Sequence, residues 1–170
     1  MNNTQPSPFL LSAVNLEKTH HQGDESLTIF KGISLDLRAG EMVALVGPSG
    51  AGKSTFLQMI GLLDKPTAGQ VFIRGKNATG LDDEARTQMR RESLGFVYQF
   101  HFLQPEFSAL ENVMIPQMIA GVSKAEAKTK SAELLEKMGL GHRLEHRPAR
   151  LSGGEQQRVA IARALEKKKK

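Results

Sequence analysis

The first half of the chain alternates short apolar runs with turns. Three runs have strand-like patterns: residues 9–16, 27–30 and the alternating residues 33–37. The run Met42–Val46 is apolar without alternation, which is typical of a strand buried on both faces of a parallel sheet. Glycines follow it, and Lys53–Leu63 has the pattern of an apolar helix. We therefore predict a strand, a glycine-rich loop and a helix in that order.

The second half carries more helix signals. After a turn at residues 65–69, the pattern predicts a strand at 71–73, a charged helix at 82–92 and a strand at 94–98. Two Ser-x-x-Glu capping boxes then predict helix starts at Ser108 and Ser123. The first helix should kink or break near Pro116. The second should end at Gly139 and place five side chains on one face: Ala127, Ser131, Leu134, Leu135 and Met138.

Composition narrows the classes of protein. The chain has 170 residues and 39% hydrophobic content, enough for one domain with a core. Four of its five net positive charges come from the tail Lys167–Lys170, and no basic stripe with aromatics occurs elsewhere, so we expect no nucleic-acid partner. The absence of cysteine excludes disulfides and thiolate metal sites. We expect a flexible N-terminus at 1–8, one domain at 9–165 and a lysine tail at 166–170.

A phosphate-binding motif follows the predicted buried strand. It matches G-x-x-x-x-G-K-[ST] at every fixed position and consists of Gly47, Pro48, Ser49, Gly50, Ala51, Gly52, Lys53 and Ser54, followed by Thr55. Glycines let several backbone N–H groups approach phosphate oxygens, and a helix start adds its positive dipole end. Lys53 should reach the β- and γ-phosphates, and Ser54 should bind Mg²⁺. Kinases, GTPases and transport ATPases all remain compatible with this motif.

A second glycine-containing helix start narrows the choice. It is the segment Leu151, Ser152, Gly153, Gly154, Glu155, Gln156, Gln157 and Arg158. Ser152 and Glu155 form a capping box, and the two glycines leave the first helical amides uncovered. An ordinary capped surface helix would look similar, but here a phosphate loop precedes it on the same chain. Together the two motifs resemble those of the ATP-binding-cassette transporter ATPases.

The resemblance implies a fold, ligands and partners. The fold is an α/β P-loop NTPase with an N-terminal antiparallel β subdomain, an incomplete core parallel sheet and a helical subdomain. Its ligands would be ATP and Mg²⁺, with Gln99 contacting Mg²⁺ and the attacking water, and His20 stacking on adenine. Residues Ser152–Glu155 would contact ATP held by a second copy. Integral membrane permease subunits would hold this homodimer at the cytoplasmic face of the inner membrane, and the chain would touch the membrane only through them.

Residues around Gln99 and further along the chain indicate a subgroup. They resemble the ATPases of lipoprotein-releasing systems, and macrolide-efflux and cell-division ATPases share much of this pattern. A DNA-repair or translation ATPase fits it less well. The residues that carry the resemblance are Gly95 to His101, Leu103, Pro105, Phe107, Ala109 to Val113, Gly141 to Arg143 and His146 to Pro148.

The sequence departs from the family pattern after the signature helix. The Asp-Glu pair that supplies the Mg²⁺ ligand and the general base is not present. All five histidines precede Leu151, so the switch histidine is missing as well. Positioned Mg²⁺ and water account for much of the rate of phosphoryl transfer. The alternative expectation is therefore a fragment, truncated at its C-terminal end, that binds nucleotide without efficient hydrolysis.

Overall fold

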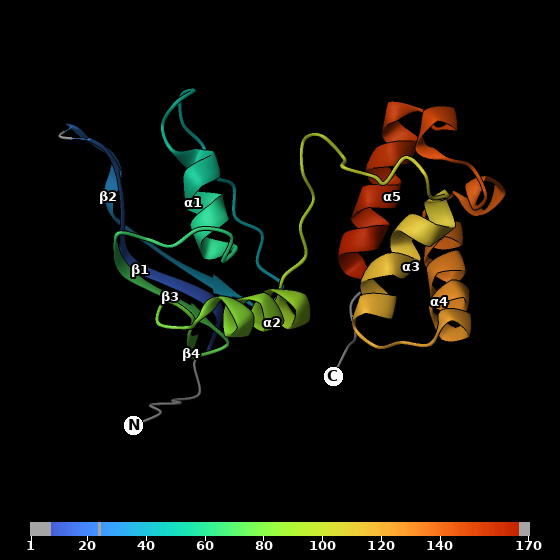
Figure 1. Cartoon of the computed structure of the whole chain (residues 1–170), viewed down its shortest axis with the longest axis horizontal. Coiled ribbons are helices and arrows are strands. Elements are labelled where there is room, and N and C mark those ends of the chain that lie inside the picture. Colours follow the sequence, from blue (N-terminus) through green and yellow to red (C-terminus); the bar gives the residue numbers. More distant parts are fainter. Residues whose placement is uncertain (1–7, 24, 167–170) are drawn as a thin grey trace. The chain divides into compact units, whose positions relative to one another are not determined.

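The computed structural model describes residues 8–23 and 25–166. The chain divides into two compact units, residues 1–93 and residues 94–170 (Figure 1). The predicted flexible N-terminus and lysine tail lie outside the described residues, apart from Pro8 and Glu166. Within 8–23 and 25–166, no helix is both long and apolar enough to cross a bilayer.

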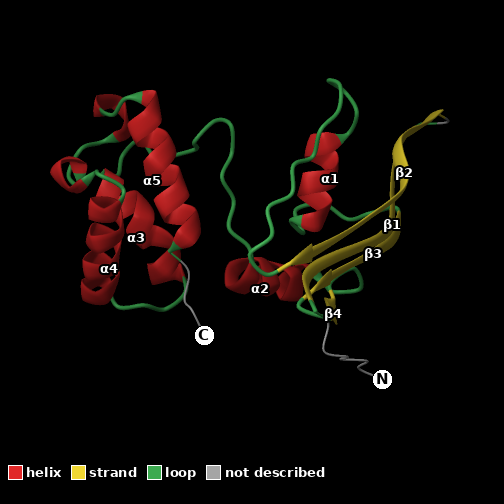
Figure 2. Ribbon diagram, turned by 180° about the vertical axis from the view of Figure 1, so that it is seen from behind, coloured by secondary structure: helices red, strands yellow, loops and turns green. Residues whose placement is uncertain are grey.

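The first unit is built on a four-stranded antiparallel sheet (Figure 2). Its strands are β1 (Phe9–Gln22), β2 (Glu25–Arg38), β3 (Ala68–Ile73) and β4 (Lys76–Asn77), in the order β2-β1-β3-β4. The alternating pattern of β1 and β3 buries one set of side chains: Leu11, Ala13, Leu16, Val71 and Ile73. The predicted N-terminal antiparallel subdomain is thus confirmed.

Two helices complete this unit. Helix α1 (Lys53–Ile60) buries Phe56, whose ring meets Phe30 of β2 edge to face at 5.9 Å between ring centroids. The helix ends at Ile60 rather than at the predicted Leu63, because Leu62 has a left-handed backbone with φ of 59°. Helix α2 (Asp83–Ser93) has acidic residues in its first turn and arginines in its last, an arrangement that suits the helix dipole.

Two predicted strands, the one expected in a core parallel sheet and the one at 94–98, are not strands in the structure. Residues 42–46 and 94–98 have no regular secondary structure. Met42 is 96% exposed and Val46 is 86% exposed, so the run is not buried on both faces. A parallel strand needs a hydrogen-bonded neighbour, and all strand pairs among the described residues are antiparallel. An apolar run by itself therefore does not form the strand that its composition favours.

The second unit is helical. Its elements are α3 (Ala109–Ile119), α4 (Lys124–Lys137), the short 3₁₀ turns η1 (Gly141–Arg143) and η2 (Pro148–Arg150), and α5 (Gly153–Leu165). Both predicted helix starts, at Ser108 and Ser123, are confirmed. The three α-helices bury one apolar core: Ala109, Leu110, Val113, Met114, Ala127, Leu135, Leu140, Leu151, Val159 and Ala162.

Helix α3 does not break at Pro116. It continues to Ile119, although proline removes one backbone donor from the helix. Val113 and Met114 before the proline and Gln117 directly after it are buried, which holds the helix on both sides of the proline. The predicted inner face of α4 is confirmed, because Ala127, Ser131 and Leu135 are fully buried and two further predicted side chains, Leu134 and Met138, pack against the core.

Candidate nucleotide-binding site

The phosphate-binding motif forms a loop that only glycine can complete. Gly50 and Gly52 have φ of 81° and 79°, in the left-handed region that L side chains rarely adopt. A Cβ atom on Gly52 would lie 2.7 Å from Cγ2 of Ile29 and 2.9 Å from Cδ1 of Phe30, both on β2. The loop thus passes so close to the sheet that a side chain at Gly52 does not fit.

Helix α1 begins at the end of this loop without a side-chain cap from the described residues. Its N-cap residue is Gly52, so its first amides remain suited to an external anion. The Lys53 ammonium donates to the carbonyl oxygens of Gly47 at 2.8 Å and Pro48 at 2.6 Å. The Ser54 side chain is exposed in the first turn. An ammonium, free amides and an accessible hydroxyl therefore occur together at one helix start.

The remaining predicted residue of this unit, His20, lies on β1. It pairs with Leu27 across the ladder, and its side chain is exposed. Leu27 is two residues along β2 from Ile29, the residue that meets the loop at Gly52. His20 thus belongs to the same unit as the phosphate loop and to the ladder that supports it.

The second glycine-containing motif forms the start of α5 and is capped from within. The Ser152 hydroxyl accepts from the Glu155 amide at 3.3 Å, and the Ser152 amide donates to the Glu155 carboxylate at 2.7 Å. Ser152, Gly153 and Gly154 are all exposed. A Cβ on Gly153 would meet no described atom within 4 Å. The capping box predicted from the sequence is confirmed, and the glycines leave this helix start open to solvent.

Glu155 is held by more than its cap. Its carboxylate also accepts from Nε of Arg143 at 2.8 Å. The Ser152 amide, the Ser152 hydroxyl and then the Arg143 guanidinium lower the pKa of Glu155 from 4.5 to about 2. Glu155 therefore stabilises the helix start directly, in addition to any contact with a ligand.

Gln99 lies at an exposed bend in the second unit. Arg163 of α5 fixes the segment just after it, by donating to the carbonyl oxygens of His101 at 2.7 Å and Phe102 at 2.6 Å. The rings of Tyr98 and Phe102 meet edge to face at 5.4 Å. Gln99 and the signature helix thus share one unit, whereas the phosphate loop belongs to the other.

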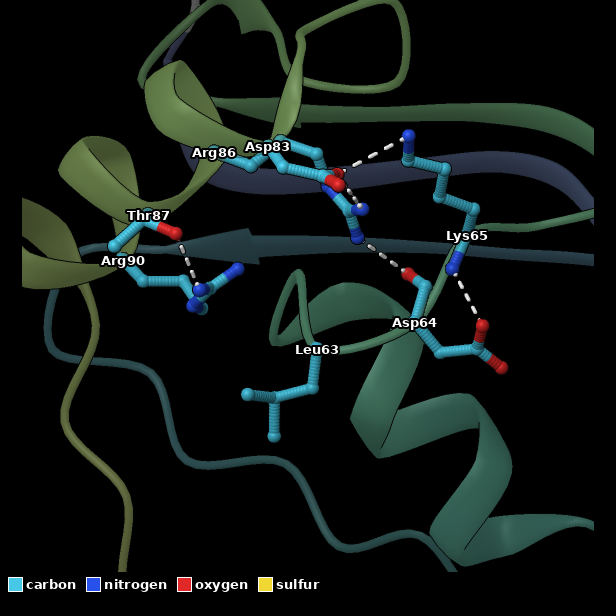
Figure 3. Close-up of a pocket in the computed structure, with 7 residues that line it drawn as sticks. All are labelled: Leu63, Asp64, Lys65, Asp83, Arg86, Thr87 and Arg90. Atoms are coloured by element: carbon cyan, nitrogen blue, oxygen red, sulfur yellow. Dashed lines mark hydrogen bonds and ion pairs between the residues drawn. The ribbon is translucent and has the colours of Figure 1, made fainter.

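Sequence reasoning missed two arginines of α2. Arg86 and Arg90 line a hollow of about 520 Å³ beside the C-terminal end of α1 (Figure 3). Its other lining residues are Leu63, Asp64, Lys65, Asp83 and Thr87. Arg86 is only 6% exposed, which is unusual for arginine. The i, i+4 spacing of the pair was the only signal in the sequence.

Comparison with known proteins identifies the family. The family model for ABC transporters matches residues 30–170, which include both glycine-containing motifs. The chain belongs to the ABC transporter family. Its antiparallel sheet and helical unit are those of an ABC ATPase fold. A solved dimer of the ATP-binding cassette MJ0796, in a post-hydrolysis state bound to ADP and Pi, matches with a TM-score of 0.82 and 43% identity. The match covers 91% of this ABC chain and 68% of that one.

Curated relatives of this ABC protein share more than half of its residues. The lipoprotein-releasing system ATP-binding protein LolD of Paramagnetospirillum magneticum is 59% identical over 151 residues, which are 89% of this chain and 67% of that protein. The protein of the same name from Maricaulis maris is 55% identical over 159 residues, 94% of this chain and 69% of the relative.

Proposed function

We propose that this chain is the ATP-binding part of an ABC transporter subunit that couples ATP binding and hydrolysis to release of lipoproteins from the inner membrane. The geometry of the phosphate loop carries the nucleotide part of the proposal. Gly52, Lys53 and Ser54 bring an uncapped helix start, a cation and an accessible hydroxyl together. Lipoprotein as the cargo is proposed from the relatives, which are named as parts of lipoprotein-releasing systems.

Each predicted site residue has a role in this proposal. The backbone N–H groups of residues 47 and 49–55 would bind phosphate oxygens, and Lys53 would offset their charge. Ser54 would hold Mg²⁺, which supplies charge neutralisation when bound, and the family resemblance also assigns Gln99 to this ion. His20 would offer its ring to adenine. The chain's own contribution is a loop whose glycine backbone is already bent for an anion.

The signature helix start gives the proposal its second half. Its exposed residues Ser152–Gly154 would meet the nucleotide held by a second copy of the subunit. A dimeric relative of known structure supports this arrangement. Permease subunits would provide the membrane contact, and the chain would act from the cytoplasmic face of the inner membrane.

Equilibrium binding of Mg-ATP to the purified chain tests the nucleotide role. Saturable binding is expected, and Lys53→Ala should abolish it because the only cation that donates within the loop is lost. Lys31→Ala is a matched control, because Lys31 is an exposed lysine of the same unit. Its Nζ lies 4.0 Å from Oε2 of Glu17. Circular dichroism confirms that each variant is folded. Unchanged affinity in folded Lys53→Ala protein would refute the assignment.

The cargo is tested separately. The chain should co-purify with the permease subunits of a lipoprotein-releasing system when these are co-expressed, and not with those of a macrolide-efflux or cell-division system. Co-purification with the subunits of a macrolide-efflux or cell-division system would leave the proposed ATPase role intact and refute lipoprotein as the cargo.

A further inference from the structure

The C-terminal end of α1, opposite the phosphate loop, leads into a turn whose backbone conformation is unfavourable but is held by surrounding contacts. Leu62, just beyond the helix, is in the left-handed region with φ of 59° and is only 2% exposed. Such a conformation is costly for a residue other than glycine, and it persists only when surrounding contacts hold it. The structure shows which contacts do so.

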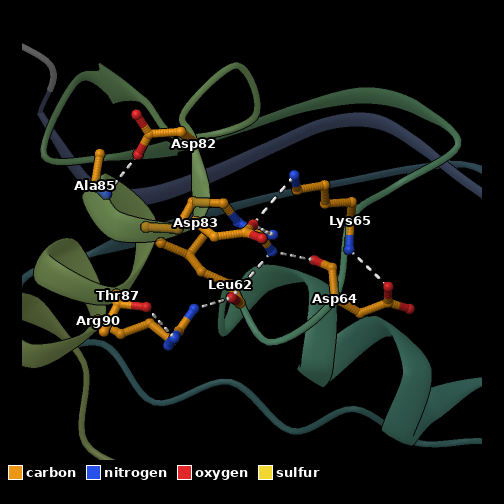
Figure 4. A network of polar contacts seen from close by, with 9 residues as sticks. Leu62, Asp64, Lys65, Asp82, Asp83, Ala85, Thr87 and Arg90 are labelled. Carbon is orange, nitrogen blue, oxygen red and sulfur yellow. Dashed lines mark hydrogen bonds and ion pairs between the residues drawn. The ribbon is translucent and has the colours of Figure 1, made fainter.

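Two arginines of α2, Arg86 (Figure 3) and Arg90 (Figure 4), bind the carbonyl groups of this turn. Arg86 donates through Nη2 to Leu62 O at 3.0 Å and to Asp64 O at 2.9 Å. Arg90 donates through Nη1 to the same Leu62 oxygen at 2.7 Å. Because the two arginines are four residues apart on one helix, both face α1. A single backbone oxygen thus receives two charged donors.

Other groups reinforce the same turn. Lys18 of β1 donates to Lys65 O at 2.9 Å and pairs with the Asp64 carboxylate at 2.7 Å, and its side chain is only 12% exposed. Asp83 accepts from Arg86 at 3.5 Å and pairs with Lys65 at 3.2 Å. Cationic groups at a helix C-terminus are stabilised by the helix dipole. The C-terminal end of α1 is therefore capped by side chains from a strand and from another helix.

We propose that Arg86 and Arg90 are positioning residues for the nucleotide site. Helix α1 has eight residues and is about 12 Å long, too short to be stable by its own hydrogen bonds. Its first turn carries Lys53 and Ser54, so the arginines that hold its far end also determine the position of the Lys53 ammonium and the Ser54 hydroxyl. The inference rests on the proposed nucleotide-binding function. It adds that the affinity for phosphate depends on residues that never touch the ligand.

The two arginines differ in a way that a conservative substitution exposes. Arg86 donates to two carbonyl oxygens from Nη2 and presents Nη1 to the Asp83 carboxylate at 3.5 Å, a planar two-nitrogen geometry that the single nitrogen of lysine does not reproduce. Arg90 donates to the turn through the bond to Leu62 O, which lysine can replace, and its bond to the Thr87 hydroxyl at 2.7 Å stays within α2. Arg91 is the matched control, because it is exposed on the same helix and donates to Gln88 at 3.4 Å, within α2 itself.

The experiment measures two quantities in Arg86→Lys, Arg90→Gln, Arg90→Lys and Arg91→Gln chains. The first is Mg-ATP affinity, taken well below each melting temperature. The second is amide hydrogen exchange of residues 53–60 without nucleotide. Arg90→Gln and Arg86→Lys should weaken binding about tenfold, the effect of losing one charge-assisted hydrogen bond, and speed exchange in α1. Arg90→Lys should recover most of the affinity, and Arg91→Gln should match the parent chain.

The outcomes separate this inference from the proposed function. Parent-like affinity and exchange in folded Arg90→Gln protein would overturn it. An equal loss in Arg91→Gln would do so too, because the effect would then follow helix charge and not the bond to Leu62. If the parent chain binds no Mg-ATP, the proposed function fails, and exchange in α1 still decides whether the arginines position the helix. If Arg86→Lys does not fold, Arg90→Gln alone provides the test.

Discussion

The two glycine-containing helix starts of this protein differ in how their first amides are capped. At α1 the N-cap is Gly52, no described side chain caps the first turn, and Lys53 lies over the loop. At α5 the cap is Ser152, with Glu155 completing the box and Arg143 holding Glu155. The first start leaves its amides to a ligand, whereas the second satisfies two of its own amides internally.

This difference assigns stability and binding to different residues. In the proposed function a bound anion would balance the charge of the α1 start, and in the further inference α2 would fix its position. The α5 start is stable by itself and presents Gly153 and Gly154 as a preformed surface. Changes at α1 should therefore act mainly on affinity, and changes at the α5 cap mainly on stability.

After the loss of binding expected for Lys53→Ala, the largest effect at the α1 start is expected from Gly52→Ala. The new Cβ would need a left-handed backbone and would lie 2.7 Å from Ile29 Cγ2, so the loop must move away from β2. We expect at least about tenfold weaker Mg-ATP binding, since a backbone in this region costs roughly 1–2 kcal/mol before any clash is counted. Equilibrium binding measures the change.

Two other glycines divide this effect into its causes. Gly50→Ala imposes the left-handed cost, with φ of 81°, but its Cβ would meet no described atom within 4 Å. Gly80→Ala imposes neither cost. The affinity loss should therefore rank Gly52→Ala above Gly50→Ala, with Gly80→Ala unchanged. Equal losses at the first two positions would show that contact with β2 does not matter.

Acid should weaken the second unit, and Glu155 is the reason. Its pKa is lowered from 4.5 to about 2 in the folded chain. Between these two pH values the carboxylate of the folded chain stays ionised, whereas that of the unfolded chain takes up a proton. The stabilisation is complete above about pH 4.5 and is lost as the pH falls toward 2. The denaturant concentration at the unfolding midpoint should therefore be lower at pH 3 than at pH 6.

Tyr98 makes this measurement specific to the second unit. It is the only tyrosine, and the chain has no tryptophan, so tyrosine emission reports this unit alone. Glu155→Gln should lower the midpoint at pH 6 and reduce the difference between the two pH values. A parent-like acid response in Glu155→Gln would assign the pH dependence to other groups.

Local signals predicted much of this molecule. Of the three predicted capping boxes, those at Ser108 and Ser152 are complete, and at Ser123 the hydroxyl accepts from the Glu126 amide as Ser-x-x-Glu predicts. Such caps are visible in sequence because they depend on residues three positions apart. The phosphate loop was equally visible, since glycines and lysine at fixed spacing define it. The inner face of α4 followed from helical periodicity.

Features that depend on distant partners could not be predicted in this way. Residues 42–46 have the composition of a buried strand, yet a strand also needs a neighbour, and periodicity does not supply one. Arg86 looked like a surface charge of an acidic and basic helix, and only the fold brings it to Leu62 and Asp64, 24 and 22 residues away. The sequence therefore revealed the phosphate loop of the candidate site, but not the arginine that binds the turn at the far end of α1.

The smallest effects are expected from removing single caps, and their order tests whether the α5 start is self-sufficient. Ser152→Ala should cost about 1 kcal/mol, because the helix loses the acceptor for the Glu155 amide and the box that orients Glu155. Ser123→Ala should cost about 0.5 kcal/mol, since Ser123 caps α4 through one exposed bond of 3.3 Å. Tyrosine emission during denaturation measures both. Mg-ATP affinity of the single chain, measured before a second copy binds, should be unchanged in either variant, because neither serine belongs to the unit that holds the phosphate loop. A loss of single-chain affinity in Ser152→Ala that Ser123→Ala does not share would mean that the signature helix contributes to binding within its own chain. The division between a ligand-dependent start and a self-capped one would then have to be abandoned.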